Sequence, residues 1–448
     1  MKTDKYRRLL SCCPSLLDAA DKTANDTNED LQNNIPAQVT AYVTAPVLFC
    51  YVCYILDSVK KNNINRIFFL SRDGYILKQI ADIIIERKKL KIQTSYLYVS
   101  RYSLRNALYY KCETAEDFEN AGLFTGYTLK SAKNFLKRAG LDNRQRAEVY
   151  REIGFSNDEN KDLGDSEYSA FCEKIKNDPD LLCKIKNNSE NNYHNIMKYF
   201  EQSGLFEKGK IAVVDSGWMG TVQKTLTALV NGRTDENIIG YYFGLYRREN
   251  DNYKAFLFDV TDAYKYVPTF CNNLFECFCS APHGMTTGYR ECDGKIIPVL
   301  SDANAEMVKM AEIQTKTAVR FTEYACKNEN YIPICKMRDI SARLLKALMY
   351  KPDKQEAEIL GAFPFSDDVT EAKIQRLAGN CKGSISNILL PVRIIRKKKG
   401  KSIYPDKYIY WLYGSIVLTG CKPAWVYRLS VREWERLRLL RERRKLCR

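Results

Sequence analysis

The chain has 448 residues and a net charge of +16, with 45% hydrophobic and 28% charged residues. This is an ordinary globular composition, which excludes a globally disordered, collagen-like or low-complexity protein. Residues 382–448 hold 18 Lys and Arg against 4 Asp and Glu, so most of the positive charge lies in this tail. A nearly neutral body argues against general nucleic-acid binding, and the tail is left to meet an anionic membrane, a nucleic acid or an acidic partner.

The cysteines and the apolar runs indicate the compartment. The 16 cysteines show no regular disulfide-type spacing, which favours buried, reduced thiols. No apolar run reaches the roughly 18 residues of a membrane span, and the first residues lack the apolar stretch of a secretory signal. We therefore expect a cytoplasmic protein, with a tail able to contact the inner face of the membrane.

The N-terminal segment is polar and then abruptly apolar. Residues 1–40 are rich in Asn and Asp and predict a short helix followed by a flexible lead-in. The apolar stretch that begins at Ala41 predicts a buried helix, with Thr44 as a candidate N-cap and Pro46 in its first turn. It is short for a membrane span.

An α/β pattern follows this helix. Arg66–Leu70 is a short apolar run that predicts a buried strand, residues 71–74 a turn, and residues 75–89 a helix. A second strand pattern ends at Ser100. A strand, a helix and a second strand at this spacing are typical of a right-handed crossover between parallel strands.

The rest of the chain extends this pattern. Residues 211–215 and 237–248 predict two further strands, and residues 254–300 predict a helix, a loop and a short strand pair. We expect an α/β fold with a Rossmann-like, mostly parallel sheet, a large helical insertion and a helical, basic C-terminal region. The expected parts are a polar lead-in at 1–40, a core at 41–300 with the insertion at about 111–205, a helical region at 301–381 and a basic aromatic tail at 382–448.

The sharpest local signal follows the strand at 211–215. The strand ends in a carboxylate, two glycines could let the backbone approach a ligand, and a threonine begins a helix whose N-terminus favours an anion. The candidate ligand-binding residues here are Asp215, Ser216, Gly217, Trp218, Gly220 and Thr221. The segment has no Walker signature. The alternative is a tight strand–helix turn with Asp215 as a cap and Trp218 packed.

Two other strand ends carry charged or polar residues. After the first strand, Ser71, Arg72 and Gly74 are candidate ligand-binding residues, since a guanidinium can bind a phosphate or carboxylate in a bidentate manner. Asp73 could act as a catalytic base, bind a metal or hold Arg72. The alternative is an internal Arg–Asp pair that orders the loop.

The second strand ends in Ser100 and Arg101, which add positive charge and complete the set of candidate ligand-binding residues. In an open parallel sheet, ligands bind beyond the carboxyl ends of the strands, which is where these residues fall.

Glu276 and His283 are the remaining candidate catalytic residues. His283 lies between a proline and a glycine, a loop position from which an imidazole can reach a cleft and transfer protons near neutral pH. The alternative is a histidine that orders its loop. Carboxylates near a phosphate would suit Mg²⁺, whereas the cysteine spacings do not match a zinc site.

Four segments, FLSRDGYIL, YLYVSRYSLR, VVDSGWMGT and SAPHGMTTGY, occur in this order. They resemble the C-terminal region of predicted HAD-superfamily hydrolases that are encoded with bacterial surface-polysaccharide genes, over about residues 40–290. In those proteins a HAD module precedes this region. The resemblance implies a role in capsule or lipopolysaccharide biosynthesis, with a phosphorylated sugar or nucleotide-sugar as ligand.

The chain departs from an intact HAD phosphatase. Such an enzyme needs a nucleophilic Asp followed two residues later by a second Asp, whereas Asp73 is followed by Gly74 and Tyr75. The acidic metal pair is also absent, since Asp215 is followed by Ser216. A fainter similarity, to the phosphate and pyrophosphate loops of phosphoribosyltransferases, leaves a phosphoribosyltransferase-like enzyme as an alternative.

A non-catalytic scaffold is the competing hypothesis. The basic tail could recruit the protein to an anionic membrane or to glycan-assembly proteins, with Trp411, Tyr413 and Trp425 at the membrane interface. The other interpretation places the aromatic stretch in the core and the basic helix in solvent. Nucleic-acid binding is disfavoured because no nucleic-acid-binding motif is present.

Overall fold

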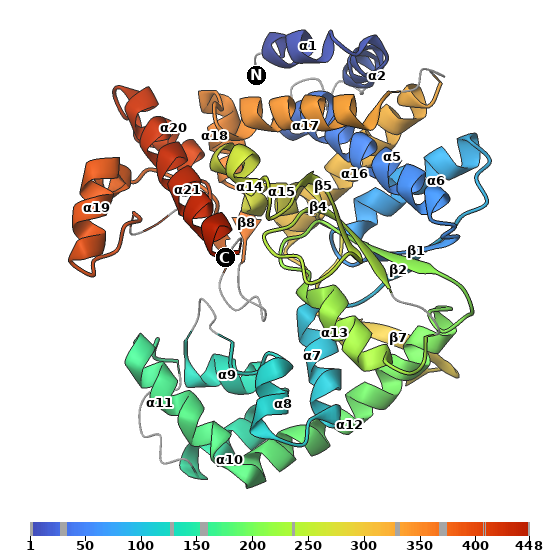
Figure 1. Cartoon of the computed structure of the whole chain (residues 1–448), viewed down its shortest axis with the longest axis vertical. Helices are drawn as coiled ribbons and strands as arrows, with labels where there is room; N and C mark the ends of the chain where they lie inside the picture. The colour runs from blue at the N-terminus through green and yellow to red at the C-terminus, as the bar shows by residue number, and fades with distance from the viewer. Residues whose placement is uncertain are drawn as a thin grey trace.

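The computed structural model describes residues 3–26, 34–125, 130–152, 160–234, 238–327, 332–366, 374–405, 407 and 409–446. Its centre is a five-stranded, all-parallel sheet in the order β2-β1-β3-β4-β5, surrounded by helices (Figure 1). The strands are β1 (Arg66–Leu70), β2 (Gln93–Leu97), β3 (Ile211–Asp215), β4 (Ile239–Gly244) and β5 (Tyr253–Phe258). The predicted Rossmann-like α/β class is confirmed. β5 was not predicted.

The strand order creates a switch point in the sheet. From β1 the chain moves outward to β2, and it then returns to place β3 on the opposite side of β1, with Phe69 paired to Val214. The connections therefore leave the carboxyl ends of β1 and β3 in opposite directions. A crevice forms at such a point, and in open α/β sheets it is the usual ligand site.

Alternate residues of the strands face two separate hydrophobic layers. On β1, Ile67 and Phe69 join one cluster, and Phe68 and Leu70 join the other, as the pleat of a strand requires. The first layer is covered by α5 (Ala45–Lys61) and α6 (Gly74–Arg87), and the second by α7 (Arg101–Leu108), α12 (Pro179–Gln202) and α13 (Thr221–Val230) (Figure 1). With both faces buried, β1, β3 and β4 are largely apolar, which is why these strands were visible in the sequence.

The apolar helix under the sheet begins earlier than predicted. It runs without a break over Ile35–Lys61 through α4 (Ile35–Val39), the π-helical turn η1 (Thr40–Thr44) and α5. Asn34 is the N-cap, and its side chain accepts a hydrogen bond from the Ala37 N–H at 3.2 Å. Thr44 is therefore not the cap, because the chain is already helical there.

By length and composition alone, this is the one helix in the described part of the chain that could cross a membrane. However, 94% of its most apolar window is buried inside the protein. It is the central helix of the core, as the sequence indicated.

The N-terminal residues differ from the expected lead-in. Helices α1 (Asp4–Leu10) and α2 (Pro14–Asn25) pack on the core through Tyr6, Leu10 and Leu16. The Tyr6 hydroxyl donates to the Glu356 carboxylate at 2.7 Å, which fixes α1 to α18 (Lys354–Gly361). Residues 27–33 of the expected flexible segment lie outside the described residues.

The expected helical insertion is present. Its helices are α8 (Ala115–Asn120), α9 (Ala132–Arg138), α10 (Asn143–Glu152), α11 (Asp165–Lys176) and the first part of α12. They gather at one end of the molecule, below the sheet in Figure 1. They enclose a hydrophobic cluster of their own that includes Phe135 and Phe171. The insertion is thus a small helical subdomain built onto α12.

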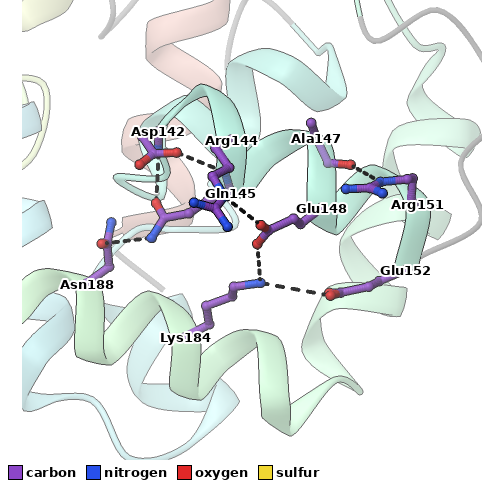
Figure 2. Close-up of polar contacts among 9 residues, drawn as sticks. All are labelled: Asp142, Arg144, Gln145, Ala147, Glu148, Arg151, Glu152, Lys184 and Asn188. Atoms are coloured by element: carbon purple, nitrogen blue, oxygen red, sulfur yellow. Dashed lines mark hydrogen bonds and ion pairs between the residues drawn. The ribbon is translucent and has the colours of Figure 1, made fainter.

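Polar contacts hold α10 against α12 (Figure 2). Lys184 pairs with Glu148 at 3.3 Å, and the Gln145 amide donates to the Asn188 side-chain oxygen at 3.1 Å. Both partners of the ion pair are partly exposed, so it contributes about 1 kcal/mol or less. The apolar cluster is the main source of stability for this subdomain.

The chain after β5 completes the shell. Its elements are α14 (Ala263–Tyr266), α15 (Asn272–Phe278), β6 (Thr286–Cys292), β7 (Lys295–Leu300), α16 (Ala305–Ala325), α17 (Ile334–Met349), α19 (Leu390–Lys398), α20 (Leu412–Thr419) and α21 (Ala424–Leu446). The antiparallel pair of β6 and β7 confirms the predicted strand pair. Every cysteine in the described part of the chain is a free thiol, which agrees with the expectation of reduced cysteines.

The aromatic stretch of the tail belongs to the core. Trp411 is fully buried and its indole N–H donates to the Met349 carbonyl at 2.8 Å, while the Tyr413 hydroxyl donates to the Pro268 carbonyl. These two side chains are therefore not available to a membrane interface, contrary to the scaffold hypothesis. Trp425 is 63% exposed.

Replacing Trp411 by Ala should lower the free energy of unfolding by about 3–5 kcal/mol, because it empties a fully buried site. Trp425→Ala is the matched control and should change it by no more than about 0.5 kcal/mol. Urea unfolding followed by circular dichroism measures both. Equal losses in the two variants would contradict the placement of the tail in the core.

Candidate functional site

A cavity of about 700 Å³ lies at the carboxyl ends of β1, β2 and β3, over the switch point of the sheet. Most residues singled out from the sequence line it, although they come from distant parts of the chain. These are Ser71, Arg72, Asp73, Ser100, Arg101, Asp215, Gly217, Trp218, Thr221, Glu276 and His283. Gly74, Ser216 and Gly220 lie next to lining residues but do not line the cavity. The structure thus brings the three predicted clusters to one place.

Several helices begin at this cavity, and they differ in how their first N–H groups are used. Ser100 caps α7 by accepting the Ser103 N–H at 2.9 Å, and Asn304 caps α16 in the same way. The N-caps of α6 and α13 are Asp73 and Gly220, and neither makes a side-chain capping bond. The positive end of α13, where Thr221 and Val222 line the cavity, therefore remains suited to a bound anion.

Ser216 joins the two strand-end carboxylates. Its hydroxyl donates to Asp73 Oδ2, and its backbone N–H donates to Asp215 Oδ1 at 2.8 Å. Ser216 itself is buried, so it positions the two carboxylates and does not face the cavity. The ends of β1 and β3 are thereby fixed to each other at the floor of the site.

The two carboxylates hold protons more tightly than free ones. Burial raises the pKa of Asp73, against the opposing effects of the Ser216 hydrogen bond and of Arg72 and Arg101. Burial, and then the negative charge of Asp73, raise the pKa of Asp215 well above its usual range. Two carboxylates in one buried site resist ionising together, so the pair keeps one proton more readily than two separate carboxylates would.

Cationic side chains surround this acidic floor. Arg72 and Arg101 line the cavity from the loops after β1 and β2, as predicted, and Lys137 joins them from α9 of the insertion. Lys137 was not predicted, because it is one of many lysines in a polar helical stretch. The insertion therefore contributes to the wall of the site.

His283 is held by hydrogen bonds on both ring nitrogens. Nδ1 lies 2.8 Å from the Gly284 carbonyl oxygen, which can only accept, so this nitrogen carries the proton. Nε2 then accepts from the Tyr96 hydroxyl at 2.8 Å. Burial lowers the pKa of His283, which favours the neutral ring. These contacts favour the loop-ordering interpretation over proton transfer to a ligand.

Glu276 is positioned by Trp218. The Trp218 indole N–H donates to Glu276 Oε1 at 2.6 Å, and the indole ring stacks on Phe258 with centroids 6.1 Å apart. Glu276 lines the cavity from α15, so its carboxylate is aimed by a side chain from the loop after β3.

The glycines of the loop after β3 serve mainly close packing. Gly220 has a φ of +65°, and a Cβ there would lie 2.4 Å from the Tyr253 ring. Gly217 has a φ of +148°, and its Cβ would lie 2.5 Å from the Gly244 carbonyl oxygen. Only glycine fits these contacts with β4 and β5. Of the two, only Gly217 reaches the cavity.

The serines of the other two loops also have structural tasks. The Ser71 hydroxyl donates to the Val99 carbonyl at 2.8 Å and joins the ends of β1 and β2. The Ser100 hydroxyl donates to the Thr286 carbonyl at 2.6 Å. These bonds fix the loops that carry Arg72 and Arg101.

Asp73 and Asp215 are the two side chains of the cavity floor that could bind a metal ion. Among the described residues, no group of three or more His, Cys, Asp or Glu side chains could hold a metal ion. Mg²⁺ is commonly bound by one or two carboxylates together with substrate phosphates and water. The two carboxylates fit that mode, in which the remaining Mg²⁺ ligands come from substrate phosphates and water.

The far wall of the cavity comes from a region that carried no interpretable motif. Asp302, Asn304 and Met307 line it around the start of α16, and Phe365 lines it near α18. These residues follow none of the strands of the parallel sheet and match no motif, so no local signal could have identified them.

No protein-family model matches the chain, and no curated protein matches it. The functional proposal therefore depends on the geometry of this cavity and on the motif resemblance.

Asp215→Asn should stabilise the protein at neutral and alkaline pH. A carboxyl with a raised pKa costs stability as the pH rises above its unfolded value of 3.8, because the unfolded chain ionises more readily. The asparagine oxygen can still accept the Ser216 N–H. The melting temperature of the variant should exceed that of the wild type at pH 8, and the difference should shrink toward pH 4.

Asp251→Asn is the control, since the Asp251 side chain is 89% exposed, and it should show no such trend. If the wild type had a higher melting temperature than Asp215→Asn at pH 8, the shared burial of the two carboxylates would be contradicted.

Proposed function

We propose that the strand-end cavity binds a phosphorylated sugar or nucleotide-type ligand, and that the protein acts in bacterial surface-polysaccharide biosynthesis. One observation carries the binding proposal. The uncapped N-terminus of α13, through Thr221 and Val222, meets Arg72, Arg101 and Lys137 in one cavity. The polysaccharide role comes from the motif resemblance.

The phosphate end of the ligand belongs near the strand ends. Helix N-termini and guanidinium groups both favour a phosphate, through backbone N–H groups and through bidentate hydrogen bonds. Arg72 lies on the loop after β1, Arg101 begins α7, and Thr221 begins α13, so three separate elements meet the cavity. A phosphate or diphosphate group matches this arrangement better than a single carboxylate does.

The sugar end belongs toward the opposite wall. Asn272, Glu276 and Ser280 line the cavity on and beside α15, and Asp302 lines it before α16. Such amide, carboxylate and hydroxyl groups are suited to hydrogen bonds with the hydroxyl groups of a sugar. A volume of about 700 Å³ lies in the range of small-molecule sites.

The carboxylate pair gives the site acid–base capacity. Asp215 can donate a proton and Asp73 can accept one, while Glu276 reaches the same cavity. Bound Mg²⁺ would neutralise charge on the ligand phosphates between the two aspartates. We do not propose a HAD phosphatase, because the position two residues after Asp73 is Tyr75, whose ring packs 5.6 Å from that of Tyr96.

A second candidate function is recruitment to a membrane. Ile394 and Ile395 of α19 are 45% and 54% exposed and lie beside Arg396 and three following lysines. An amphipathic basic helix of this kind suits the anionic inner face of a membrane. The protein would then be cytoplasmic and peripheral, close to the glycan-assembly proteins.

A thermal-shift screen against sugar phosphates, nucleotide-sugars, phosphoribosyl pyrophosphate and nucleotides, with and without Mg²⁺, should find stabilising ligands in one phosphorylated class. Calorimetry with the best ligand should show binding about 10–100-fold weaker in Arg101→Ala, since a charged hydrogen bond is worth about 1.5–3 kcal/mol.

Arg144→Ala, on the exposed face of α10, is the control and should bind like the wild type. The proposal is refuted if no phosphorylated class stabilises the protein, or if Arg101→Ala binds its ligand as tightly as Arg144→Ala.

A further inference from the structure

A second cavity, of about 420 Å³, lies between α17, α21 and the segment at residues 264–270. It shares no lining residue with the cavity at the strand ends. Its basic lining side chains come from three separate elements. They are Lys265, Arg343, Lys346, Arg432 and Arg436.

The cations of this cavity outnumber their carboxylate partners. Arg343 pairs with Asp339 at 2.5 Å. Arg432 and Arg436 share one carboxylate, that of Glu433, at 2.6 and 3.7 Å. Neither of these acids lines the cavity.

Lys265 and Lys346 have no ion pair among the residues that the structure describes. No acidic residue lines the cavity, in contrast to the strand-end site with its four carboxylates. The local field therefore favours an anion, because two carboxylates, those of Asp339 and Glu433, offset only part of the charge of five cations.

The inner walls are apolar. Tyr266, Pro268 and Phe270 line one side, and Leu257 and Leu345 line another. A cavity with apolar walls and a basic rim suits a ligand that has an anionic group on an apolar or aromatic body. A volume of about 420 Å³ is enough for a molecule of this size and is too small for a folded partner.

We propose that this cavity is a second binding site, which takes a phosphate-bearing ligand with an apolar or aromatic part. The phosphate group lies among Lys346, Arg432 and Arg436, and the apolar part lies against Tyr266 and Phe270. Several cations on different elements match the several oxygens of a phosphate better than one carboxylate. A soluble nucleotide and a phospholipid headgroup both have this chemistry.

The test uses the full chain and one charge reversal, Lys346→Glu, at a side chain with no ion pair to break in the described structure. ATP and pyrophosphate are the soluble probes, in calorimetry. Vesicles of phosphatidylcholine with and without phosphatidylglycerol are the lipid probes, in flotation. Lys401→Glu applies the same charge change in the tail outside the cavity, and Arg101→Ala reports on the strand-end site.

A nucleotide ligand predicts ATP binding that is at least 10-fold weaker in Lys346→Glu and unchanged in Lys401→Glu. A lipid headgroup predicts flotation with phosphatidylglycerol that is lost in Lys346→Glu and kept in Lys401→Glu. The proposal is overturned if Lys346→Glu binds ATP, pyrophosphate and anionic vesicles as the wild type does. Since Arg101→Ala tests the other cavity, failure here leaves the proposed function standing.

Discussion

The parallel pairing of β1 with β3 is the constraint on which the rest of the structure depends. Because β2 lies on one side of β1 and β3 on the other, the two strands end side by side with their loops directed apart. Asp215, the last residue of β3, and Asp73, in the loop after β1, are thus brought to one buried point. Ser216 then fixes their distance through its hydroxyl and its N–H. Every other feature of the strand-end site is arranged around this pair.

Two opposing electrostatic effects meet at that point. Burial disfavours ionised carboxylates and raises the pKa values of both aspartates, whereas Arg72 and Arg101 favour ionised Asp73. The two aspartates resist being ionised at the same time. They are nevertheless surrounded by cations and by a helix N-terminus, which favour a bound anion. Such an arrangement costs stability in the empty protein, and perturbed groups of this kind concentrate at functional sites. A bound phosphate would satisfy the cations, and Mg²⁺ would satisfy the acids.

The centre of the sheet and its strand ends could be predicted because β1, β3 and β4 are buried on both faces and appear in the sequence as apolar runs. β5 was missed because Tyr253–Phe258 follows a charged loop and carries a lysine, so its pattern is weaker. Lys137 and Asn304 could not be found, since their place in the cavity depends on how an insertion and a later helix fold back on the sheet. The glycine loop was located correctly, and its glycines serve contacts with Tyr253 and Gly244 that only the tertiary structure shows.

The strongly basic tail has a structural explanation that does not involve nucleic acid. One side of the tail closes the core through Trp411, and Arg393 is buried between the rings of Tyr404 and Trp434, at 5.3 and 5.4 Å from their centroids. Cation–π contacts offset part of the cost of burying that guanidinium. Arg432 and Arg436 are four residues apart on α21 and therefore lie on one face of the helix, which is the face turned to the second cavity. Trp411 anchors the tail to the core, and α21 then presents Arg432 and Arg436 to the second cavity. Part of the excess positive charge of the tail therefore lines a defined cavity.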